Sequence, residues 1–419
     1  MAALGHEVVG IDVLDGQVTS LARGEAPFHE PGLPELLTAA LATGRLRFST
    51  EPSEAAGAEM HFICVGTPQK RDENAADLSY VHASLDDLLP HLSPGDVVVG
   101  KSTVPVGTAE SMAALLRDKA PGVALLWNPE FLCEGHAVDD TLHPDRFVYG
   151  VEEGADGERA VTRLDAVYAA ALDAGTPKIV TDLATAQLVK VAANSFLATK
   201  ISFINAMAEL CEVSGADVTQ LADAIGLDDR IGRRFLDAGL GFGGGCLPKD
   251  IRAFMARAGE LGADQALSFL REVDAINLRR RVRMVDLARE ELGGSIVRRR
   301  IAVLGASFKP GSDDVRDSPA LSVADQMQLQ GAAVTVTDPS AVENARRKWP
   351  GLTFADTLEE ALEGAELMLL GTEWPAYVAL DPTVVASYVA EPRIIDGRNC
   401  LDPVVWRGAG WSYRALGRP

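Results

Sequence analysis

The sequence lacks any run of the roughly 20 apolar residues that a membrane-spanning helix needs, so we expect no membrane partner. Basic residues are scarce: 39 Lys and Arg stand against 60 Asp and Glu, and the formal net charge is -21. Nucleic-acid binding requires a basic surface, so we expect no nucleic-acid partner. The five cysteines are too scattered for a disulfide framework and lack the paired spacing of a zinc site. We therefore expect reduced thiols, no metal and a cytoplasmic location.

What the chain does contain is the composition of a globular protein, with 47% hydrophobic residues in 419. A chain of this length usually forms two or three domains. Apolar runs of strand length, as at residues 7–12 and 60–65, alternate with helical segments and are typical of buried parallel strands. Long helical patterns follow at 181–213 and 264–292, and strand–helix alternation resumes at 301–304. The pattern predicts an α/β protein with two Rossmann-like doubly wound domains, joined by a central helical domain with a long connecting helix.

Two stretches share a Gly-to-Asp spacing that fits the second strand of a βαβ unit: residues 5–12, which end in Asp12, and residues 331–338. In a dinucleotide-binding fold, a carboxylate at the end of this strand holds the ribose hydroxyls, about 20 residues after a glycine fingerprint. For Asp12 the fingerprint would precede residue 1. We therefore expect the chain to begin inside the first helix of its nucleotide domain, without the first strand and the Gly-rich loop. The alternative is that Asp12 is an ordinary turn residue.

Cys246 stands in the unusual segment Gly-Phe-Gly-Gly-Gly-Cys-Leu-Pro-Lys-Asp of residues 241–250. Glycines supply no packing surface, but Gly243 and its neighbours let the main chain pass close to a bound phosphate or sugar. Lys249 favours the thiolate form that attacks carbon. The segment predicts a catalytic nucleophile. The alternative is a buried structural thiol in a flexible loop.

A second candidate group lies on the long helix that begins near residue 181. Lys190 and Asn194 are four residues apart, in line with Leu197 and Ile201, so a lysine and an amide share an otherwise apolar face. Such a pair is suited to stabilising an oxyanion. The alternative is a lysine that extends along the helix edge towards water.

Polar residues also follow the expected strands. Thr67 lies in Val-Gly-Thr-Pro, Thr103 in Lys-Ser-Thr-Val-Pro, and Glu130 in Asn-Pro-Glu-Phe-Leu-Cys-Glu-Gly. Thr103 can hold a water molecule and Glu130 can take its proton. Glu130 and Glu134 would share a face if their segment is helical. Taken singly, each segment is equally well read as a plain loop after a strand.

Taken together, these motifs resemble the UDP-glucose/GDP-mannose dehydrogenase family. Its hallmarks recur in family order from His-Glu-Pro-Gly-Leu at 29–33 to Asp-Gly-Arg-Asn at 396–399, over nearly the whole chain. The resemblance implies an NAD-binding Rossmann-like domain at 1–178, truncated at its N-terminus. It also implies a central helical dimerisation and catalytic domain at 179–296 and a UDP-binding Rossmann-like domain at 297–419.

The resemblance further implies a four-electron oxidation at C6 of a nucleotide sugar, with two NAD molecules consumed. The alcohol becomes an aldehyde, Cys246 adds to it, a second hydride leaves, and the thioester is hydrolysed to the acid. By position in the family pattern, Lys190 and Asn194 stabilise the oxyanions, and Asp250 assists proton transfer through water. Thr103 and Glu130 activate the hydrolytic water.

The family pattern also assigns residues to the two ligands. Those for NAD are Asp12, Thr67, Thr103, Glu134, Lys249 and Arg316. Those for the nucleotide sugar are Glu130, Phe131, Leu132, Glu134, Lys190, Asn194, Arg230, Phe235, Leu236, Gly243, Phe308, Lys309 and Arg398. Since Arg230 reaches across from a partner subunit in this pattern, a homodimer is implied.

The sequence departs from the family pattern at several positions. Gln17 stands where a basic residue near Asp12 is common, and Gly245 replaces the usual serine before the cysteine. Leu247, in place of a frequent phenylalanine, also occurs in the GDP-mannose branch, whereas the segment 228–232 favours UDP-glucose. We therefore expect oxidation of UDP-glucose to UDP-glucuronate. The alternatives are oxidation of GDP-mannose or a UDP-N-acetylhexosamine, an alcohol dehydrogenase that stops at the aldehyde, and sugar-nucleotide binding without turnover.

Overall fold

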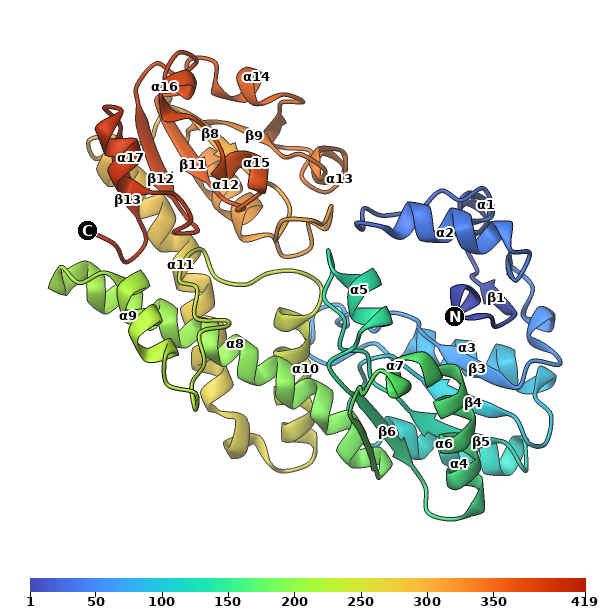
Figure 1. The fold of residues 1–419 in the computed structure, drawn as a ribbon. Helices are drawn as coiled ribbons and strands as arrows, with labels where there is room; N and C mark the ends of the chain where they lie inside the picture. The colour runs from blue at the N-terminus through green and yellow to red at the C-terminus, as the bar shows by residue number, and fades with distance from the viewer. The chain divides into compact units, whose positions relative to one another are not determined.

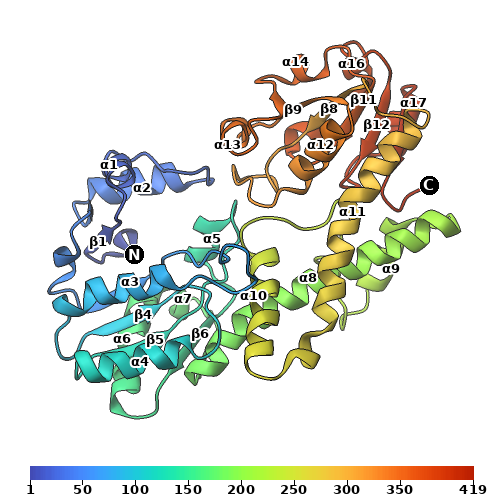
Figure 2. The same ribbon diagram turned by 180° about the vertical axis from the view of Figure 1, so that it is seen from behind.

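The computed structural model describes residues 1–419, which divide into two compact units (Figures 1 and 2). Unit 1 comprises Met1–Ala193 and Lys249–Asp264, and unit 2 comprises Asn194–Pro248 and Gln265–Pro419. The chain passes from one unit to the other within α8 (Leu183–Ser214), at the start of α10 (Leu247–Glu260) and after the first residue of η4 (Asp264–Leu267). No helix combines the length and the apolar character that a bilayer crossing requires.

Unit 1 contains a five-stranded sheet of order β3-β4-β5-β6-β7 and a separate two-stranded sheet of β1 and β2. The strands are β1 (Val8–Ile11), β2 (Leu46–Ser49), β3 (Met60–Ile63), β4 (Val97–Gly100), β5 (Ala124–Trp127), β6 (Phe147–Val151) and β7 (Lys178–Thr181). Neighbouring strands run parallel, except that β5 and β6 are antiparallel. The separate sheet, with β1 beside the N-terminus, is visible in Figure 1.

Helices cover both faces of the five-stranded sheet. On one face, Val98 of β4 belongs to a core with Leu85 of α3 (Ser79–Leu88) and Met112 of α4 (Thr108–Lys119), and on the other face Val99 packs with Leu164 of α6 (Ala155–Val167). Because both faces are buried, β4 and β5 read as continuous apolar runs in the sequence. The helices of unit 1 are η1 (Ala2–Leu4), α1 (Asp15–Ala22), α2 (Leu33–Ala42), η2 (Pro52–Ala55), α3 (Ser79–Leu88), η3 (Leu89–His91), α4 (Thr108–Lys119), α5 (Ala137–Leu142), α6 (Ala155–Val167) and α7 (Ala169–Asp173), with the first part of α8 and most of α10.

Unit 2 contains a fully parallel six-stranded sheet of order β10-β9-β8-β11-β12-β13. Its strands are β8 (Arg300–Leu304), β9 (Ala333–Thr337), β10 (Thr353–Phe354), β11 (Leu367–Leu370), β12 (Arg393–Asp396) and β13 (Ser412–Ala415). Counted along the chain, this is the order 3-2-1-4-5-6 of a doubly wound dinucleotide-binding fold. Ligands in such sheets bind where the strand order reverses, which here is between β8 and β11.

Successive side chains along each strand of this sheet also point to opposite faces. Val303 belongs to a core with residues of α11 (Phe269–Glu291) and α12 (Pro319–Leu329), whereas Leu304 packs on the other face with Trp374 and Trp406. The helices of unit 2 are α9 (Val218–Gly226), α11 (Phe269–Glu291), α12 (Pro319–Leu329), α13 (Val342–Lys348), α14 (Leu358–Leu362), α15 (Pro375–Val378), α16 (Pro382–Val385) and α17 (Pro403–Gly408), with most of α8. The predicted fold class is confirmed, and α8 and α11 are the two long helices expected at 181–213 and 264–292.

Candidate functional site

At the carboxyl end of the unit 1 strands, the loops after β3 and β4 and the first turn of α10 bring four predicted site residues together. The hydroxyl of Thr67 donates to the carbonyl oxygen of Thr103 at 2.7 Å and lies 3.3 Å from the ammonium nitrogen of Lys249. Lys249 in turn pairs with the buried carboxylate of Asp250 at 2.6 Å. A hydroxyl and an ammonium group at the carboxyl end of parallel strands fit the ribose and phosphate oxygens of a dinucleotide.

A second group in unit 1 surrounds Glu130, which follows β5. Its Oε1 accepts from the backbone N–H groups of Phe131 and Leu132 at 2.7 and 3.0 Å, and its Oε2 lies 2.9 Å from the Lys101 ammonium group. Lys190 of α8 lies over the ring of Phe131, 5.4 Å from its centre. The structure therefore gathers Glu130, Phe131, Leu132 and Lys190. Their segment is irregular rather than helical, so the condition for Glu130 and Glu134 to share a helix face is not met.

Glu30, from the His-Glu-Pro-Gly-Leu motif, fixes the loop that carries Glu134. Its buried carboxylate accepts from the backbone N–H groups of Gly135 and Ala137, both at 2.7 Å. These contacts join residues more than 100 positions apart in the chain. The motif was the only signal for Glu30 in the sequence, and no role was predicted for it.

Asp12 lies at the carboxyl end of β1, as predicted, and its Oδ1 accepts from Leu14 N at 2.9 Å. The corresponding residue of unit 2, Asp338, follows β9 and behaves differently. One of its oxygens accepts from the N–H groups of Ala306 and Ser307 and from the indole of Trp374. The protein's own groups thus occupy the carboxylate of Asp338.

In unit 2, the glycine-rich loop that precedes Cys246 is packed tightly on the protein. A Cβ atom at Gly243 would lie 2.3 Å from the carbonyl oxygen of Asp317, and one at Gly244 would lie 2.8 Å from the ring of Phe308. Gly244 also has φ +85°, a conformation that favours glycine. The sequence interpretation assigned these glycines to close ligand approach, but the protein's own atoms already require them.

Side chains of α11 hold this loop, and sequence reasoning missed them. The amide of Asn277 pairs with the backbone of Phe242, accepting from its N–H at 2.8 Å and donating to its carbonyl at 2.9 Å. The buried guanidinium of Arg281 donates to Asp317 at 2.8 Å. Cys246 is exposed and directly precedes α10, so it lies at the positive end of the helix dipole. Reactive cysteines occur in this setting.

The point of strand-order reversal in unit 2 gathers three predicted nucleotide-sugar residues. Phe308 and Lys309 follow β8, and the Lys309 ammonium group lies 5.3 Å from the centre of the Phe308 ring. Arg398 follows β12 and donates to the carbonyl oxygens of Gly371 at 2.8 Å and Gly241 at 3.1 Å. Arg398 thus joins the glycine-rich loop to the carboxyl edge of the sheet, where a diphosphate would meet cationic groups.

Three further predicted residues, Arg230, Phe235 and Leu236, make none of the contacts described above. Arg230 is 89% exposed and pairs only two residues back, with Asp228. Phe235 is partly exposed with φ +65°, whereas Leu236 is buried in the core of α8 and α9. Asn194 lies on α8 and is buried. The guanidinium of Arg316 pairs with Asp314 and lies against Gly245.

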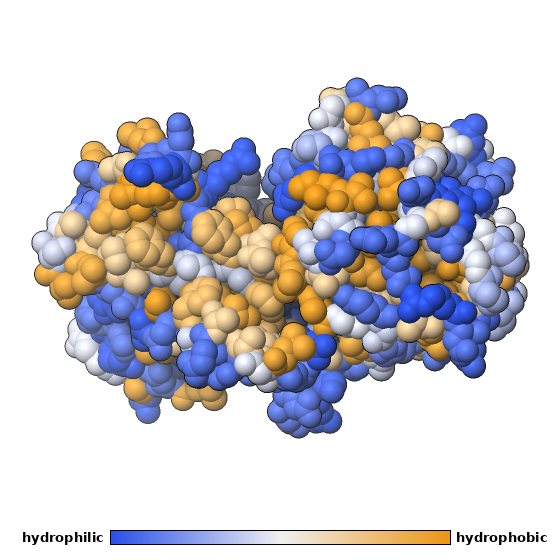
Figure 3. Space-filling view, turned by 90° about the horizontal axis from the view of Figure 1, so that it is seen from below, coloured by the Kyte–Doolittle hydropathy of each residue, from blue (hydrophilic) through white to orange (hydrophobic).

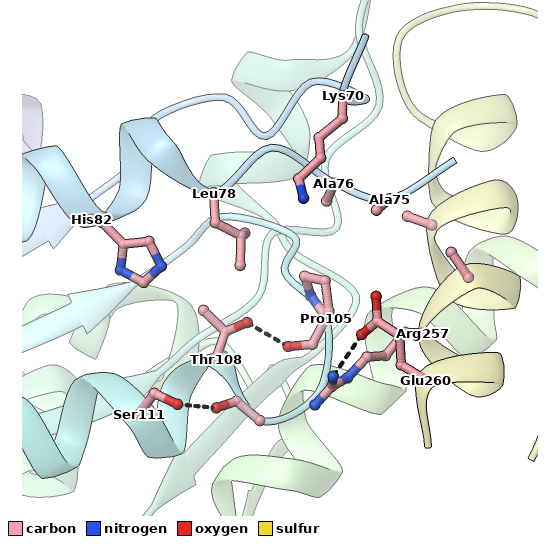
Figure 4. Close-up of a pocket in the computed structure, with 13 residues that line it drawn as sticks. Lys70, Ala75, Ala76, Leu78, His82, Pro105, Thr108, Ser111, Arg257 and Glu260 are labelled. Atoms are coloured by element: carbon pink, nitrogen blue, oxygen red, sulfur yellow. Dashed lines mark hydrogen bonds and ion pairs between the residues drawn. The ribbon is translucent and has the colours of Figure 1, made fainter. Parts of the chain in front are cut away.

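Unit 1 contains a cavity of about 320 Å³, whose lining residues are drawn in Figure 4. It lies between the segment before α3, the start of α4 and α10, and Arg257 on its wall donates to the Val106 carbonyl at 2.8 Å and pairs with Glu260. Its lining residues are Lys70, Ala75, Ala76, Leu78, His82, Pro105, Gly107, Thr108, Ser111, Ala253, Ala256, Arg257 and Glu260. No predicted site residue is among them. Elsewhere, no cluster of three or more His, Cys, Asp or Glu side chains is arranged to hold a metal ion.

Comparison with known proteins gives matches along the whole chain. Three family models match: the UDP-glucose/GDP-mannose dehydrogenase family NAD binding domain at residues 1–172, the central domain at 184–279 and the UDP binding domain at 302–403. A UDP-glucose 6-dehydrogenase of Rhizobium meliloti is 41% identical over 421 residues, which cover 100% of this chain and 95% of that protein. A UDP-glucose 6-dehydrogenase of Bacillus subtilis is 37% identical, with 100% and 94% covered. The solved structure of a UDP-glucose dehydrogenase from Pyrobaculum islandicum superposes with a TM-score of 0.89 at 38% identity, covering 100% of this chain and 94% of that one.

Proposed function

Because the chain belongs to the UDP-glucose/GDP-mannose dehydrogenase family, we propose that it is an NAD-dependent oxidoreductase that converts UDP-glucose to UDP-glucuronate. The observation that carries this proposal is the match over the entire chain to relatives named for that activity. An exposed cysteine in a rigidly held loop at a helix start supports it independently, since a thioester route needs such a thiol.

In the proposed mechanism, Asp12, Thr67 and Lys249 would hold NAD, which would supply the hydride acceptor for C6 of the sugar. Cys246 then adds to the aldehyde to give a thiohemiacetal, and Lys190 and Asn194 donate to the oxygen that carries the developing negative charge. Transfer of a second hydride from C6 to a second NAD molecule, with loss of the hydroxyl proton, converts the thiohemiacetal into the thioester on Cys246. Asp250, paired with Lys249, moves a proton through water. Glu130 and Thr103 orient the water that cleaves the thioester, and Glu130 accepts its proton.

The ligand contacts are part of the same proposal. We assign Asp12, Thr67, Thr103, Glu134, Lys249 and Arg316 to NAD. We assign Glu130, Phe131, Leu132, Glu134, Lys190, Asn194, Arg230, Phe235, Leu236, Gly243, Phe308, Lys309 and Arg398 to UDP-glucose. The proposed domains are an NAD-binding domain at 1–178, a helical domain at 179–296 and a UDP-binding domain at 297–419.

A homodimer and a cytoplasmic location complete the proposal. Phe196, Phe203 and Leu210 are 66%, 48% and 57% exposed on α8 at heptad spacing, so they form one apolar stripe that a second copy would cover. Apolar residues occupy much of the face seen in Figure 3. Cys64, Cys211 and Cys400 are free thiols, which suits a reducing compartment.

The deciding experiment measures NADH release from NAD with UDP-glucose, GDP-mannose and UDP-N-acetylhexosamines in parallel. Two NADH molecules for each UDP-glucose, with UDP-glucuronate as product, are expected. A preference for GDP-mannose would reassign the substrate, and one NADH for each sugar would indicate an alcohol dehydrogenase that stops at the aldehyde. Binding of UDP-glucose without any NADH release would reduce the chain to a sugar-nucleotide binding protein.

A further inference from the structure

Lys101 has no role in the mechanism above, yet two polar side chains of unit 1 hold its ammonium group. It follows β4 directly, and its side chain is only 14% exposed. Its ammonium group lies 2.9 Å from Oε2 of Glu130 and donates to Oδ1 of Asn128 at 3.2 Å. A buried lysine costs free energy unless its charge is compensated, so this placement requires an explanation.

The partners of Lys101 are themselves fixed. Asn128 is 1% exposed, and its Nδ2 donates to the carbonyl oxygen of Val148 at 3.0 Å. This contact turns Oδ1 towards Lys101, where it also accepts from the hydroxyl of Tyr168 at 3.1 Å. The ring of Tyr168 is stacked on Phe147 of β6 with ring centres 4.4 Å apart. Lys101 therefore rests on a rigid support built from β4, β5, β6 and the end of α6.

The Glu130 carboxylate is held from both sides. Lys101 engages Oε2, and the N–H groups of Phe131 and Leu132 engage Oε1. Its side chain is 38% exposed, so it meets solvent while Lys101 lies behind it. The contact with Glu130 therefore links Lys101 to the proposed reaction. We propose that Lys101 is a positioning residue, which fixes the orientation and the negative charge of the Glu130 carboxylate for thioester hydrolysis.

Electrostatics support this assignment. Burial alone would raise the pKa of the Glu130 carboxyl, but the charge and hydrogen bond of Lys101 and the N–H groups of Leu132 and Phe131 hold that pKa below its ordinary value. Burial likewise opposes the charge of Lys101, but Tyr168 and Glu130 raise the pKa of its ammonium group above the ordinary value. The charge of Cys64 also raises the pKa of Lys101, and Lys190 lies over the ring of Phe131. The two side chains thus favour each other's ionised form around neutral pH.

The inference rests on the proposed function, because it concerns one step of that reaction. Water oxygen bonds to the thioester carbonyl carbon, and Glu130 takes one water proton. The carbon–sulfur bond then breaks, its electron pair goes to the sulfur of Cys246, and the acid leaves as a carboxylate after losing its remaining proton. A carboxylate that is misplaced or protonated slows this step and leaves both hydride transfers unaffected.

The test compares Lys101→Met, Lys101→Arg and, as a matched control, Lys119→Met at an exposed site on α4. In Lys101→Met we expect hydrolysis to slow about tenfold or more, with thioester on Cys246 accumulating in intact-mass spectra and an unchanged rate of first NADH release. The acid limb of the hydrolysis rate should move to higher pH. Lys101→Arg should retain part of the rate, and Lys119→Met should match the unaltered protein.

A second readout does not need turnover. The carboxyl carbon of Glu130, labelled with ¹³C and assigned with Glu130→Gln, should titrate at higher pH in Lys101→Met than in the unaltered protein. An unchanged titration, or an equal loss of the hydride-transfer and hydrolysis rates, would overturn the inference. If the unaltered protein releases no NADH, the proposed function fails while the titration still decides the role of Lys101.

Discussion

At the scale of single residues, the candidate site depends on a few groups whose surroundings differ from those of chemically similar residues. Cys246 is exposed at the start of α10, whereas Cys211 is 3% exposed in the core of α8 and α9. The carboxylate of Asp12 accepts a hydrogen bond from one backbone N–H group, whereas the carboxylate of Asp338 accepts hydrogen bonds from backbone N–H groups of the loop after β8. The two cysteines thus form a matched pair, in which Cys246 is tested and Cys211 serves as a control.

Replacing Cys246 by serine should stop acid formation. Serine is a weaker nucleophile than cysteine, and its ester is hydrolysed more slowly than a thioester because alkoxide is the poorer leaving group. We therefore expect kcat to fall more than about 100-fold. Stopped-flow detection of NADH and mass-spectrometric detection of the acid measure this effect. Cys211→Ala should retain activity. Full acid production by Cys246→Ser would contradict the covalent role.

Replacing Asp12 by alanine should weaken NAD binding selectively. Loss of a charged hydrogen bond to a ribose costs about 1.5 kcal/mol, so the Kd for NAD should rise about tenfold while the Kd for UDP-glucose stays constant. Isothermal titration calorimetry measures both constants. Asp15→Ala, at the start of α1, is the control, and equal NAD affinity in the two variants would remove Asp12 from the cofactor site.

The Glu130–Lys101 pair also gives a pH dependence of stability. The lowered pKa of Glu130 contributes stability that is present above the ordinary carboxyl range and is lost as pH falls through the lowered value. The raised pKa of Lys101 contributes stability that is present below its ordinary value and is lost as pH rises through the raised one. We expect the difference in thermal stability between the unaltered protein and Lys101→Met to be largest near neutral pH and to shrink at both extremes. A difference independent of pH would contradict the pairing.

At the scale of elements, α8 and α11 are joined by an ion pair that their sequences do not reveal. Arg280 of α11 is 0% exposed and donates to Glu212 of α8 at 3.0 Å, and Arg283 also pairs with Glu212 at 2.6 Å. Figures 1 and 2 both show the two helices crossing in unit 2. Such a pair adds little over an apolar contact, but breaking it leaves a buried charge without compensation.

We therefore expect Glu212→Gln to lower the free energy of unfolding of unit 2 by about 3 kcal/mol. Glu209→Gln is the matched control on the same helix, because Glu209 is 39% exposed and approaches the same arginine at 3.8 Å. Its effect should stay below about 1 kcal/mol. Urea unfolding followed by circular dichroism measures the free energy of unfolding of both variants. Similar effects would show that the buried contact of Glu212 stabilises the protein no more than the exposed contact of Glu209.

The elements and the candidate residues were predictable to different degrees. Strands such as β4 and β5 were visible because burial on both faces makes them continuous apolar runs, and α8 was visible because of its length. The antiparallel pairing of β5 with β6 carries no local signal. Cys246 and Lys190 were found through their motifs. Asn277, Tyr168 and the role of Lys101 were not, because their contacts join segments 27 to 40 positions apart and arise only on folding.

At the scale of the whole molecule, the exposed stripe on α8 predicts self-association. Replacing Phe203 by glutamate places a charge in the middle of the stripe, so a dimer that covers it should dissociate. Light scattering coupled to size-exclusion chromatography should show a monomer. Leu329→Glu is the control, since Leu329 is 80% exposed at the end of α12, outside the stripe. Dimers in both variants would place the interface elsewhere.

The two-stranded sheet of unit 1 has a consequence for the motions of the protein. Strands β1 and β2 pair only with each other, so no hydrogen bonds join them to the five-stranded sheet. The hydrogen bonds of Glu30 connect the segment between α1 and α2 to the loop before α5. Regions with few such ties open locally at a lower free energy than the core. The amides of β1 and β2 should therefore exchange with solvent deuterium before those of β4 and β5. Since Asp12 lies on this sheet, a bound dinucleotide would slow that opening, and cofactor affinity would include the free energy of ordering the segment.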